Sequence, residues 1–536
     1  MTTSAQTQSA PAPDTVSPAH APWQDVPQIV SEVQALKDKF SSPDLCVSAV
    51  LCDDHPPSDT AFVVVDGDLN VEHLSFGALS ESSKKLASAL AKQRVTRGVR
   101  VGVLMGKTRQ LPIVLLALWR LGAIHVPLFT AFAGEAIATR LNAAQANLLI
   151  ADPDQCSKLD DVAIPILQSG SELDVLIDSH EPLEQSERIG SDGIFVQLYT
   201  SGTTGTPKGV PVPAFAIASF IAYMRYGFDL RADDVFWNGA DPGWAYGLYF
   251  SVIGPLAVGH SNILLSAPFS TKITKQVADK LKVSNFASAP TVYRALRKDG
   301  IEFSTPLRVA SSAGEPLTPE ISSWAEKALG SPVRDHWGQT EQGMGIVNAW
   351  DSRLLRDSKD GSMGQAMPGF VAGTVGDTLA LSVSESPLMW FLGYKDDPEQ
   401  TQERYTADKA WYLSGDAGRH DGTDFFFAAR ADDVILASGY RISPFDIESI
   451  LASDPAVSEV AVVGRRYADS VSGEVIEAFV TLAPGAVTDG LEQRLQDLVR
   501  TRYGRHGYPR HIHIVDSLPK TPSGKIRRVD LRHVDG

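Results

Sequence analysis

The sequence predicts an α/β protein with a large N-terminal domain and a smaller α+β domain at the C-terminus. Three observations lead to this prediction. Short apolar runs alternate with helical stripes over the first two thirds of the chain, which is typical of mainly parallel sheets covered by helices. Gly and Pro become frequent after Asp360, which indicates a small β-rich subdomain. Beyond Asp433 a compact α+β pattern follows. The 536 residues are enough for three to four compact units of about 150 residues each.

The first half of the chain alternates between segments with the pattern of a β-strand and segments with the pattern of an α-helix. A β-branched run at 62–65 turns at Asp66-Gly67 and predicts a strand. The elements expected next are a helix with Leu79, Leu86 and Leu90 on one face, a strand at 99–105, a helix with Leu111, Leu115 and Leu118, and a strand at 147–151. A second series of the same kind runs from Phe195 to Trp337. Such repeats predict parallel strands.

The second half predicts the domain boundary. The segment 424–429 reads as a strand of the β-rich region. The elements expected after it are a helix at 445–451, strands at 460–463 and 477–482, a helix at 491–500 and a strand at 512–515. We place the boundary at Arg430–Asp433. The predicted organisation is a disordered, Ser/Thr/Ala/Pro/Gln-rich arm at 1–22, an N-terminal domain at 23–431 and a C-terminal domain at 432–536.

Composition narrows the class of protein. The 48 Lys and Arg residues against 64 Asp and Glu residues give a net charge of −16, which argues against a nucleic-acid or anionic-membrane binder. Three cysteines, Cys46, Cys52 and Cys156, lack metal-ligand spacing and fit a reducing cytosol. The first 36 residues contain no Lys or Arg and no apolar core of a signal peptide. The apolar stretch 111–119 is too short to span a bilayer. We therefore expect a cytoplasmic protein.

The strongest local signal is the segment Thr200-Ser-Gly-Thr-Thr-Gly-Thr-Pro-Lys-Gly209, which follows an apolar strand. Its glycines let backbone amides approach an anion closely, and its hydroxyls add donors. Lys208 supplies a positive charge suited to phosphate oxygens. A Walker A loop requires Gly-Lys-Ser/Thr, whereas Lys208 stands between Pro207 and Gly209. The segment therefore predicts a phosphate-binding loop of another kind, and it argues against a P-loop switch or motor.

Six motifs in order resemble the AMP-forming adenylating superfamily, which includes acyl-CoA synthetases, peptide-synthetase adenylation domains and luciferases. They are Thr200 to Gly209, Ser312-Ala-Gly-Glu-Pro316, Asp335-His-Trp-Gly-Gln-Thr-Glu341, Tyr412-Leu-Ser-Gly-Asp416, Arg430-Ala-Asp-Asp433 and Pro519-Lys-Thr-Pro-Ser-Gly-Lys525. The resemblance covers about residues 40 to 530 and is strongest to short- and medium-chain acyl-CoA synthetases. It implies an acid–thiol ligase that joins a carboxylate to AMP and then to CoA.

The resemblance implies a role for each motif. Trp337 offers a flat face for adenine, Asp416 binds the ribose hydroxyls, and Arg430 adds a ribose or phosphate contact. Glu341 is the expected ligand of Mg²⁺. The catalytic residues implied are Lys525, Glu341 and Thr340. The ATP- and AMP-binding residues implied are Thr200, Ser201, Gly202, Thr203, Thr204, Gly205, Thr206, Lys208, Gly314, Glu315, Pro316, Asp335, His336, Trp337, Gly338, Gln339, Thr340, Asp416, Arg430 and Lys525.

The family's second half-reaction implies a rotation of the C-terminal domain about a hinge, here Asp432. The segment 437–445 resembles medium-chain acyl-CoA synthetases in particular, and its expected CoA-binding residues are Ser438, Gly439, Tyr440 and Arg441. One residue departs from that subgroup, because Ser472 stands where the subgroup has an Arg. Arg465 and Arg466 are candidates to supply the missing charge.

Two places predict the size of the acid. Trp244, Ala245 and Tyr246 align with a segment that lines the acyl pocket, and Gly338 stands where acetate-specific relatives carry a second Trp. A hydrogen in place of an indole predicts a channel for acids longer than acetate. We therefore expect a short-to-medium-chain fatty or small aryl carboxylate. An acetate/propionate–CoA ligase and an adenylation enzyme that loads a carrier protein remain alternatives.

Two further possibilities come from single residues. The resemblance raises acetylation of Lys525, which would bring a protein acetyltransferase and deacetylase as partners. His511 and His513 share one face of a predicted strand, but the sequence places no carboxylate or Cys beside them, which argues against a metal site there.

Overall fold

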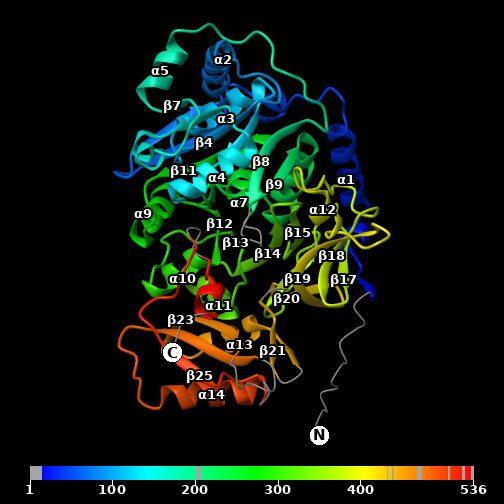
Figure 1. Cartoon of the computed structure of the whole chain (residues 1–536), viewed down its shortest axis with the longest axis vertical. Helices are drawn as coiled ribbons and strands as arrows, with labels where there is room; N and C mark the ends of the chain where they lie inside the picture. Colours follow the sequence, from blue (N-terminus) through cyan, green and yellow to red (C-terminus); the bar gives the residue numbers. More distant parts are fainter. Residues whose placement is uncertain are drawn as a thin grey trace.

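The structure, a computed structural model, describes residues 15–200, 207–430, 433–437, 440–466, 474–504, 507–521 and 525–532, apart from the side chains of Arg430, Tyr440 and Arg441. The chain forms a tall N-terminal domain with a smaller C-terminal domain below it in the view of Figure 1. No helix among these residues is long and apolar enough to cross a membrane.

The upper part of the N-terminal domain is a sheet in the order β7-β6-β4-β5-β8-β9, parallel except for the pair β8–β9. Alternate residues of its strands enter two different cores, one shared with α2 and α3 and the other with α4, so helices cover both faces. The strands are β4 (Arg100–Leu104), β5 (Ile124–Pro127), β6 (Leu148–Ala151), β7 (Ile166–Gln168), β8 (Ile194–Thr200) and β9 (Lys208–Pro213).

A second sheet joins the parallel strands of the chain's middle to the β-rich region. Its order is β1-β17-β18-β19-β20-β16-β15-β14-β13-β12-β10, parallel from β10 to β14 and antiparallel from β14 onward. The strands are β1 (Val16–Pro18), β10 (Phe236–Asn238), β12 (Asn285–Ser288), β13 (Val309–Ala313), β14 (Val333–Gln339), β15 (Gly343–Val347), β16 (Ser362–Ala366), β17 (Ala372–Val375), β18 (Thr378–Ser382), β19 (Trp411–Asp421) and β20 (Asp424–Arg430).

A small sheet of β11 (Asn262–Ser266), β2 (Thr60–Asp66) and β3 (Val71–Ser75) completes the N-terminal domain. Helix α2 begins where the Ser75 side chain accepts a hydrogen bond from the Ala78 amide, as expected of an N-cap. The helices are α1 (Pro27–Phe40), α2 (Phe76–Lys92), α3 (Gln110–Arg120), α4 (Gly134–Ala144), α5 (Ser171–Asp178), α6 (Ile217–Ala222), α7 (Ala245–Gly247), α8 (Gly254–Val258), α9 (Thr271–Leu281), α10 (Pro290–Lys298), α11 (Pro319–Ala328) and α12 (Pro398–Gln402), with short η segments at Pro22–Asp25, Ala49–Asp53, Pro153–Lys158, Ala214–Ala216, Tyr223–Gly227 and Leu248–Ile253.

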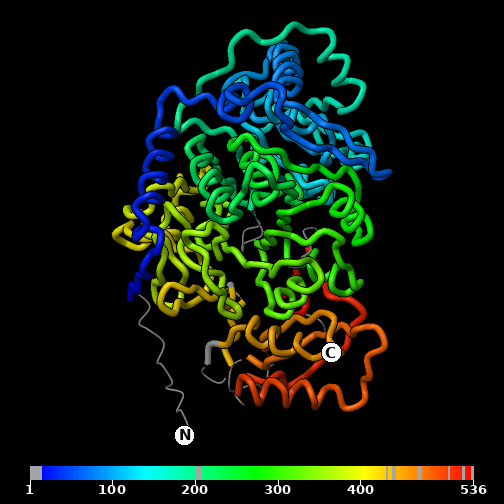
Figure 2. The backbone as a smooth tube through the Cα atoms, turned by 180° about the vertical axis from the view of Figure 1, so that it is seen from behind, coloured from blue at the N-terminus to red at the C-terminus, as the bar shows by residue number. Residues whose placement is uncertain are grey.

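The C-terminal domain is built on a sheet in the order β23-β24-β25, with a separate hairpin β21–β22. One face of the sheet packs against α13 and α14, and the other is covered by residues around Leu518 and Leu531. Its elements are β21 (Ile435–Ala437), β22 (Tyr440–Ile442), α13 (Pro444–Ala452), β23 (Val457–Arg465), β24 (Val475–Leu482), α14 (Leu491–Arg502), β25 (His511–Ile514) and α15 (Arg528–Arg532). Figures 1 and 2 show α15 and the segment before it, in red, against the lower end of the N-terminal domain.

These observations confirm the predicted fold class, and they refine it in one respect. The β-rich region is continuous in hydrogen bonding with the parallel strands, because β14 and β15 form an antiparallel hairpin that extends the sheet. The boundary of the N-terminal arm needs correction. Residues 16–18 form β1, paired with β17, and Trp23 donates an indole hydrogen bond to the Phe370 carbonyl at 2.7 Å. An edge strand offers backbone partners even to a polar segment. Residues 1–14 lie outside the described residues.

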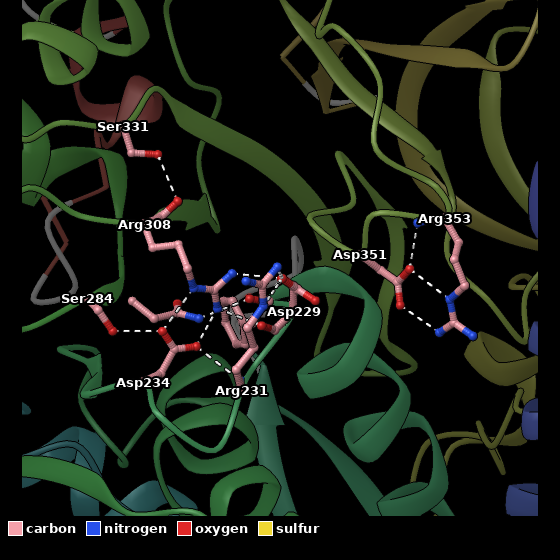
Figure 3. A network of polar contacts seen from close by, with 10 residues as sticks. Asp229, Arg231, Asp234, Ser284, Arg308, Ser331, Asp351 and Arg353 are labelled. Carbon is pink, nitrogen blue, oxygen red and sulfur yellow. Dashed lines mark hydrogen bonds and ion pairs between the residues drawn. The ribbon is translucent and has the colours of Figure 1, made fainter.

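The amino ends and the carboxyl ends of the parallel strands have different surroundings. At the amino ends, Arg308, before β13, bonds Asp229 at 2.7 Å and also Asp234, before β10 (Figure 3). Ser284, before β12, donates to Asp234 at 2.7 Å. This network ties three neighbouring strands together. The carboxyl ends of the same strands face a large cavity, which is where ligands bind in open α/β sheets.

Candidate active site

The cavity has a volume of about 1800 Å³. Pockets for drug-sized ligands are typically 300 to about 1000 Å³, so this cavity has room for more than one substrate. Its walls come from the carboxyl ends of β8, β13 and β14, from β19, and from the C-terminal domain, including Thr521 and Lys525. The cavity therefore lies between the two domains.

Asp416 anchors one wall through side chains from β14. The Trp337 indole Nε1 donates to Asp416 Oδ2 at 2.9 Å, and Gln339 Nε2 donates to the same oxygen at 2.9 Å. Gln339 is itself held by the Tyr412 hydroxyl at 3.0 Å and donates to the Ser414 carbonyl. The Asp416 carboxylate is only 6% exposed. Two donors fix its orientation in the cavity wall, which prepares it to accept hydrogen bonds from neighbouring hydroxyls.

Glu341 belongs to a second cluster. The Tyr394 hydroxyl donates to Glu341 Oε1 at 2.9 Å and accepts from Arg404 Nε at 2.8 Å. Arg404 also donates to the Ser414 carbonyl at 2.7 Å. The Lys208 ammonium lies 5.2 Å from the centre of the Tyr394 ring. Burial, followed by the positive charge of Arg404, lowers the pKa of Lys208 below its usual range. Two cations and a carboxylate thus converge on one part of the cavity.

Trp337 and the turn Gly314-Glu315-Pro316, which were predicted to enclose adenine, all line the cavity. Gly314 has φ +97°, a backbone conformation that residues with a side chain rarely adopt. Glu315 is held by the Thr291 hydroxyl at 3.1 Å and by Arg294 of α10.

Asp335 lines the same part of the cavity. Its Oδ2 accepts from the Leu317 amide at 3.3 Å. Its Oδ1 is buried without a hydrogen-bond partner among the described residues. Burial raises the pKa of Asp335 to about 8. At neutral pH the group is therefore mainly a neutral carboxyl, and its unpaired oxygen beside the cavity is suited to a hydrogen bond with a ligand.

Lys525 reaches the cavity from the C-terminal domain. Its carbonyl accepts from the Thr521 amide at 2.7 Å, and its amide donates to Thr521 Oγ1 at 3.1 Å. Arg528, just beyond, donates to both carboxylate oxygens of Glu448 at 2.9 and 2.8 Å. Lys525 therefore lines the same cavity as Trp337, Asp335 and Asp416.

The predicted phosphate loop is the connection of a hairpin. Thr200, at the end of β8, pairs with Lys208, at the start of β9, and both line the cavity. Residues 201–206, which include the predicted Ser201, Gly202, Thr203, Thr204, Gly205 and Thr206, lie outside the described residues. The described ends of the hairpin thus open onto the cavity. Thr340 lines it too, and its carbonyl accepts from the Tyr249 hydroxyl at 2.9 Å.

The predicted acyl-pocket residues Trp244, Ala245, Tyr246 and Gly338 all line the cavity. The physical reason for Gly338 differs from the predicted one. A Cβ at this position would lie 2.1 Å from the Gly343 carbonyl oxygen and 2.7 Å from Met344 Sδ. Glycine is therefore required by the close approach of β15 at a β-bulge, and Met344 occupies part of the space beside it.

His336 is not exposed to a nucleotide through its ring nitrogens. Nδ1 lies 2.6 Å from the Tyr223 hydroxyl, and Nε2 lies 3.2 Å from the Asn348 carbonyl. The ring is buried on the face of β14 opposite Trp337, as the alternation of side chains along a strand requires. His336 is among the residues that line the cavity, and its role in binding a nucleotide stays a prediction.

Most of the remaining predicted residues lie outside the part of the chain that the structure describes. Asp432, Ser438, Gly439 and Ser472 lie outside the described residues, as do the side chains of Arg430, Tyr440 and Arg441. Arg465, a candidate for the CoA charge, donates to the buried Glu477 at 3.1 Å.

The histidine pair has a neighbour that the sequence did not indicate. His513 Nε2 lies 2.8 Å from Glu477 Oε2, so the expectation of no carboxylate beside this pair was wrong. The parallel pairing of β24 with β25 brings Glu477 alongside. No group of three or more His, Cys, Asp or Glu residues in the described part of the chain is placed to hold a metal ion.

Sequence reasoning missed Tyr223, Tyr394 and Arg404. None of them belongs to a motif, and each contacts the site through one side chain from a different element. The one weak signal for Arg404 is Gly415 in the ribose motif, which has φ +73°. A Cβ at Gly415 would lie only 2.8 Å from the Arg404 guanidinium, so the glycine leaves room for it. No pattern in the sequence pairs Tyr223 with His336.

Comparison with known proteins identifies the class. The family described as AMP-binding enzyme matches residues 52–379, and the family described as AMP-binding enzyme C-terminal domain matches residues 446–525. The chain therefore belongs to the AMP-binding enzymes, and its class is that of an AMP-forming carboxylate–CoA ligase. The predicted family and enzyme class are both confirmed.

Individual relatives agree with this assignment. The chain is 33% identical to acetyl-coenzyme A synthetase of Bacillus subtilis (strain 168), covering 86% of this chain and 85% of that one. It is 33% identical to the mitochondrial acyl-coenzyme A synthetase ACSM3 of Rattus norvegicus, with coverage of 89% and 86%. The crystal structure of a Brucella canis acyl-CoA synthetase is 37% identical, with a TM-score of 0.70 and coverage of 91% and 94%.

Proposed function

We propose that this enzyme activates a short-to-medium-chain or small aryl carboxylate with ATP and transfers the acyl group to CoA. The observation that carries the proposal is that Lys525, from the C-terminal domain, shares one cavity with Trp337, Asp335 and Asp416 of the N-terminal domain. A nucleotide bound by Trp337, Asp335 and Asp416 would present its phosphates to Lys525. The relatives named as acetyl- and acyl-CoA synthetases support CoA as the acceptor.

The nucleotide would be bound by three features. Trp337 and the turn 314–316 would enclose the adenine, and the unpaired Asp335 Oδ1 would accept from its exocyclic amino group. Asp416, oriented by Trp337 and Gln339, would accept from both ribose hydroxyls. Thr200 and Lys208, at the ends of the β8–β9 hairpin, would approach the phosphates.

The donor set fits Mg²⁺ at Glu341. Mg²⁺ usually takes one or two carboxylates together with phosphate oxygens and water, and Glu341 is a cavity-lining carboxylate held by Tyr394. When bound, the ion would offset the charge of the phosphates. Lys208 and Arg404, which add positive charge near Glu341, would also offset the negative charge of the phosphates.

In the first half-reaction, a carboxylate oxygen of the acid would attack the α-phosphorus of ATP. The bond between the α-phosphorus and the bridging oxygen breaks, and pyrophosphate leaves with the electron pair. Negative charge accumulates where the two anions meet, and the Lys525 ammonium would stabilise it in the transition state. The products are enzyme-bound acyl-AMP and pyrophosphate.

In the second half-reaction, the CoA thiolate would attack the acyl carbonyl carbon, and AMP leaves as the carbon–oxygen bond to its phosphate breaks. We propose that the C-terminal domain rotates about Asp432 between the two steps. Ser438, Gly439, Tyr440 and Arg441 would then approach CoA. This part of the proposal rests on the sequence resemblance.

Substrate size follows from the walls of the pocket. Gly338 leaves no side chain in the cavity, but Met344 Sδ lies close beside it, and Tyr246 also lines the cavity. The remaining space favours acids of modest length over long chains. An acetate/propionate ligase is the principal alternative within this class, and loading of a carrier protein is the alternative for the second half-reaction.

The proposal includes a location and a form of regulation. The three cysteines are free, in keeping with a cytoplasmic protein. Acetylation of Lys525 by a protein acetyltransferase would remove the ammonium and stop the first half-reaction. Mass spectrometry of the protein from cells checks this point, and an always unmodified Lys525 would contradict it.

The test is a panel of acetate, butyrate, octanoate and benzoate with ATP, scored for pyrophosphate release without CoA and for AMP release with CoA. We expect both signals, with a kcat/KM higher for at least one larger acid than for acetate. A strong preference for acetate would favour the acetate/propionate alternative. Pyrophosphate release without any CoA-dependent AMP release would favour a carrier protein as acceptor.

A further inference from the structure

A chain of polar groups leads from the cavity wall into the core. Tyr246 of α7 lines the cavity, and its hydroxyl lies 3.4 Å from the Tyr223 hydroxyl. The Tyr223 hydroxyl lies 2.6 Å from His336 Nδ1, and His336 Nε2 lies 3.2 Å from the Asn348 carbonyl. Tyr223 and His336 are 0% and 2% exposed.

The last group in this chain fixes the direction of every hydrogen bond. The Asn348 carbonyl can only accept, so His336 Nε2 carries a proton and donates it. Burial lowers the pKa of His336 to about 3, so the ring is neutral and Nδ1 has no proton. His336 Nδ1 therefore accepts from the Tyr223 hydroxyl. Because the proton of Tyr223 is used in this way, its oxygen accepts from Tyr246.

The consequence for the cavity is a hydrogen-bond acceptor. The Tyr246 proton points inward to Tyr223, and the lone pairs of the Tyr246 oxygen are left for whatever occupies the pocket. The Tyr246 ring has aromatic surroundings, since it packs edge-on against Phe250 at 5.4 Å between ring centres. Burial, and to a smaller extent the charge of Asp335, raises the pKa of the Tyr246 hydroxyl, which keeps its proton. An acid that places only C–H groups beside the Tyr246 oxygen would leave this acceptor buried without a hydrogen bond and would therefore bind less tightly.

The packing holds this arrangement in place. Tyr223 lies 4.5 Å from the ring centres of both Phe228 and Phe250. Gly227 permits this position, because a Cβ there would lie 2.4 Å from the Tyr223 ring. Asn348, which supplies the terminal carbonyl, is itself fixed by donating to the Asp335 and Ser362 carbonyls at 2.9 and 2.7 Å.

We propose that Tyr246 determines substrate specificity, and that the acid is a small aryl carboxylate with a hydroxyl or amino group that donates a hydrogen bond to the Tyr246 oxygen. This inference rests on the proposed function and narrows its substrate class. Aromatic walls suit an aryl ring. Because the Tyr246 hydroxyl donates its proton to Tyr223, its oxygen favours a hydrogen-bond donor over an acceptor as the substituent on that ring.

The experiment compares matched acids by kcat/KM for pyrophosphate release. Benzoate is the reference, the three hydroxybenzoate isomers carry a donor, and the corresponding methoxybenzoates carry an acceptor of similar position. We expect one hydroxybenzoate to exceed benzoate about tenfold, the effect of one neutral hydrogen bond. Its methyl ether should fall below benzoate, because it adds bulk and cannot donate.

Tyr246→Phe tests the residue itself and leaves the pair of Tyr223 and His336 intact. We expect the ratio of kcat/KM for the best hydroxybenzoate to that for benzoate, measured on the same variant, to fall from about tenfold to about onefold. Tyr226→Phe is the matched control. Its hydroxyl donates to Glu32 at 2.6 Å, away from the cavity, and its preference should equal that of the wild type.

The outcomes separate this inference from the proposed function. If wild-type enzyme activates aliphatic acids or benzoate but shows no preference for any hydroxybenzoate, the inference is overturned and the ligase assignment stands. If the preference is present and Tyr246→Phe retains it in full, Tyr246 is not its source and the inference is likewise overturned. If no acid in either panel releases pyrophosphate, the proposed function itself fails.

Discussion

Trp337 and Asp416 are joined by a hydrogen bond of 2.9 Å from the indole Nε1 to a carboxylate oxygen, although they belong to different motifs on β14 and β19. The bond couples the residue proposed to face adenine with the residue proposed to bind ribose. One contact thus orients the two groups that would hold the nucleoside, and a change at Trp337 should affect both.

Trp337→Phe should raise the KM for ATP about tenfold while leaving kcat within a few-fold. The ring for stacking is retained, but Asp416 loses a donor, and a hydrogen bond to a charged group contributes about 1.5–3 kcal/mol. Steady-state kinetics of pyrophosphate release measure this change. Trp324→Phe, in α11 and outside the cavity lining, is the control. An unchanged KM for ATP would show that the indole N–H does not position Asp416.

Lys525→Ala should reduce acyl-AMP formation by about 10²- to 10³-fold, because one preorganised charge is lost from the transition state. Thioester formation from supplied acyl-AMP and CoA should persist. Lys520→Ala is a matched control in the same segment, since Lys520 pairs with Glu459 at 2.6 Å and does not line the cavity. Normal pyrophosphate release by the Lys525 variant would reject the assigned role.

Arg404→Met should lower kcat for pyrophosphate release about tenfold or more. The Tyr394 hydroxyl and the Ser414 carbonyl each lose a charged donor, so Glu341 is held less firmly. The same assay, with circular dichroism to verify folding, measures the effect. Arg419→Met, at an exposed position of β19, is the control, and an equal loss there would indicate a general effect on the sheet.

Gly338→Ala should lower Tm by several degrees, because its Cβ would lie 2.1 Å from the Gly343 carbonyl oxygen and overpacking costs about 1–3 kcal/mol. Gly345→Ala on the paired strand is the control, since the nearest atoms there are side-chain atoms at 3.3 Å. Thermal unfolding compares the two variants. Equal stability of Gly338→Ala and wild type would restore the simpler view that this glycine only opens the acyl pocket.

Arg308→Met should destabilise the protein by about 3 kcal/mol at neutral pH, because it leaves the buried Asp234 carboxylate without its cation. Burial raises the pKa of Asp234, but the hydrogen bond from Arg308 and further donors outweigh it, so the folded-state pKa is lowered. A lowered pKa stabilises the folded protein above the unfolded-state value near 3.8, and this contribution is lost as pH falls through the folded value.

The difference in Tm between Arg308→Met and wild type should therefore be large at pH 7 and shrink as the pH falls below about 4. Arg231→Met is the control, because Arg231 is 53% exposed in its pair with Asp229 and a surface pair contributes about 1 kcal/mol or less. A difference in Tm that is constant from pH 7 to pH 3 would exclude the ionised Asp234 as its source.

Much of the site could be predicted because its chemistry resides in short contiguous segments. A turn that approaches phosphates needs glycines and hydroxyls at fixed spacing, and Thr200 and Lys208 at its ends indeed face the cavity. Trp337, Asp416 and Lys525 were recognised in the same way, each within a motif. The alternation of apolar runs predicted the parallel strands, since the period of a buried strand is a local property.

The sequence by itself determined the class of enzyme, the alternation of strands and helices, and the motifs whose described residues line the cavity. Only the tertiary structure decided the rest. Tyr223 and His336 are 113 residues apart and meet at 2.6 Å, and Gly338 is required by the approach of a neighbouring strand. Such contacts depend on how separate elements pack, and packing between distant segments leaves no periodic or spaced pattern in the chain.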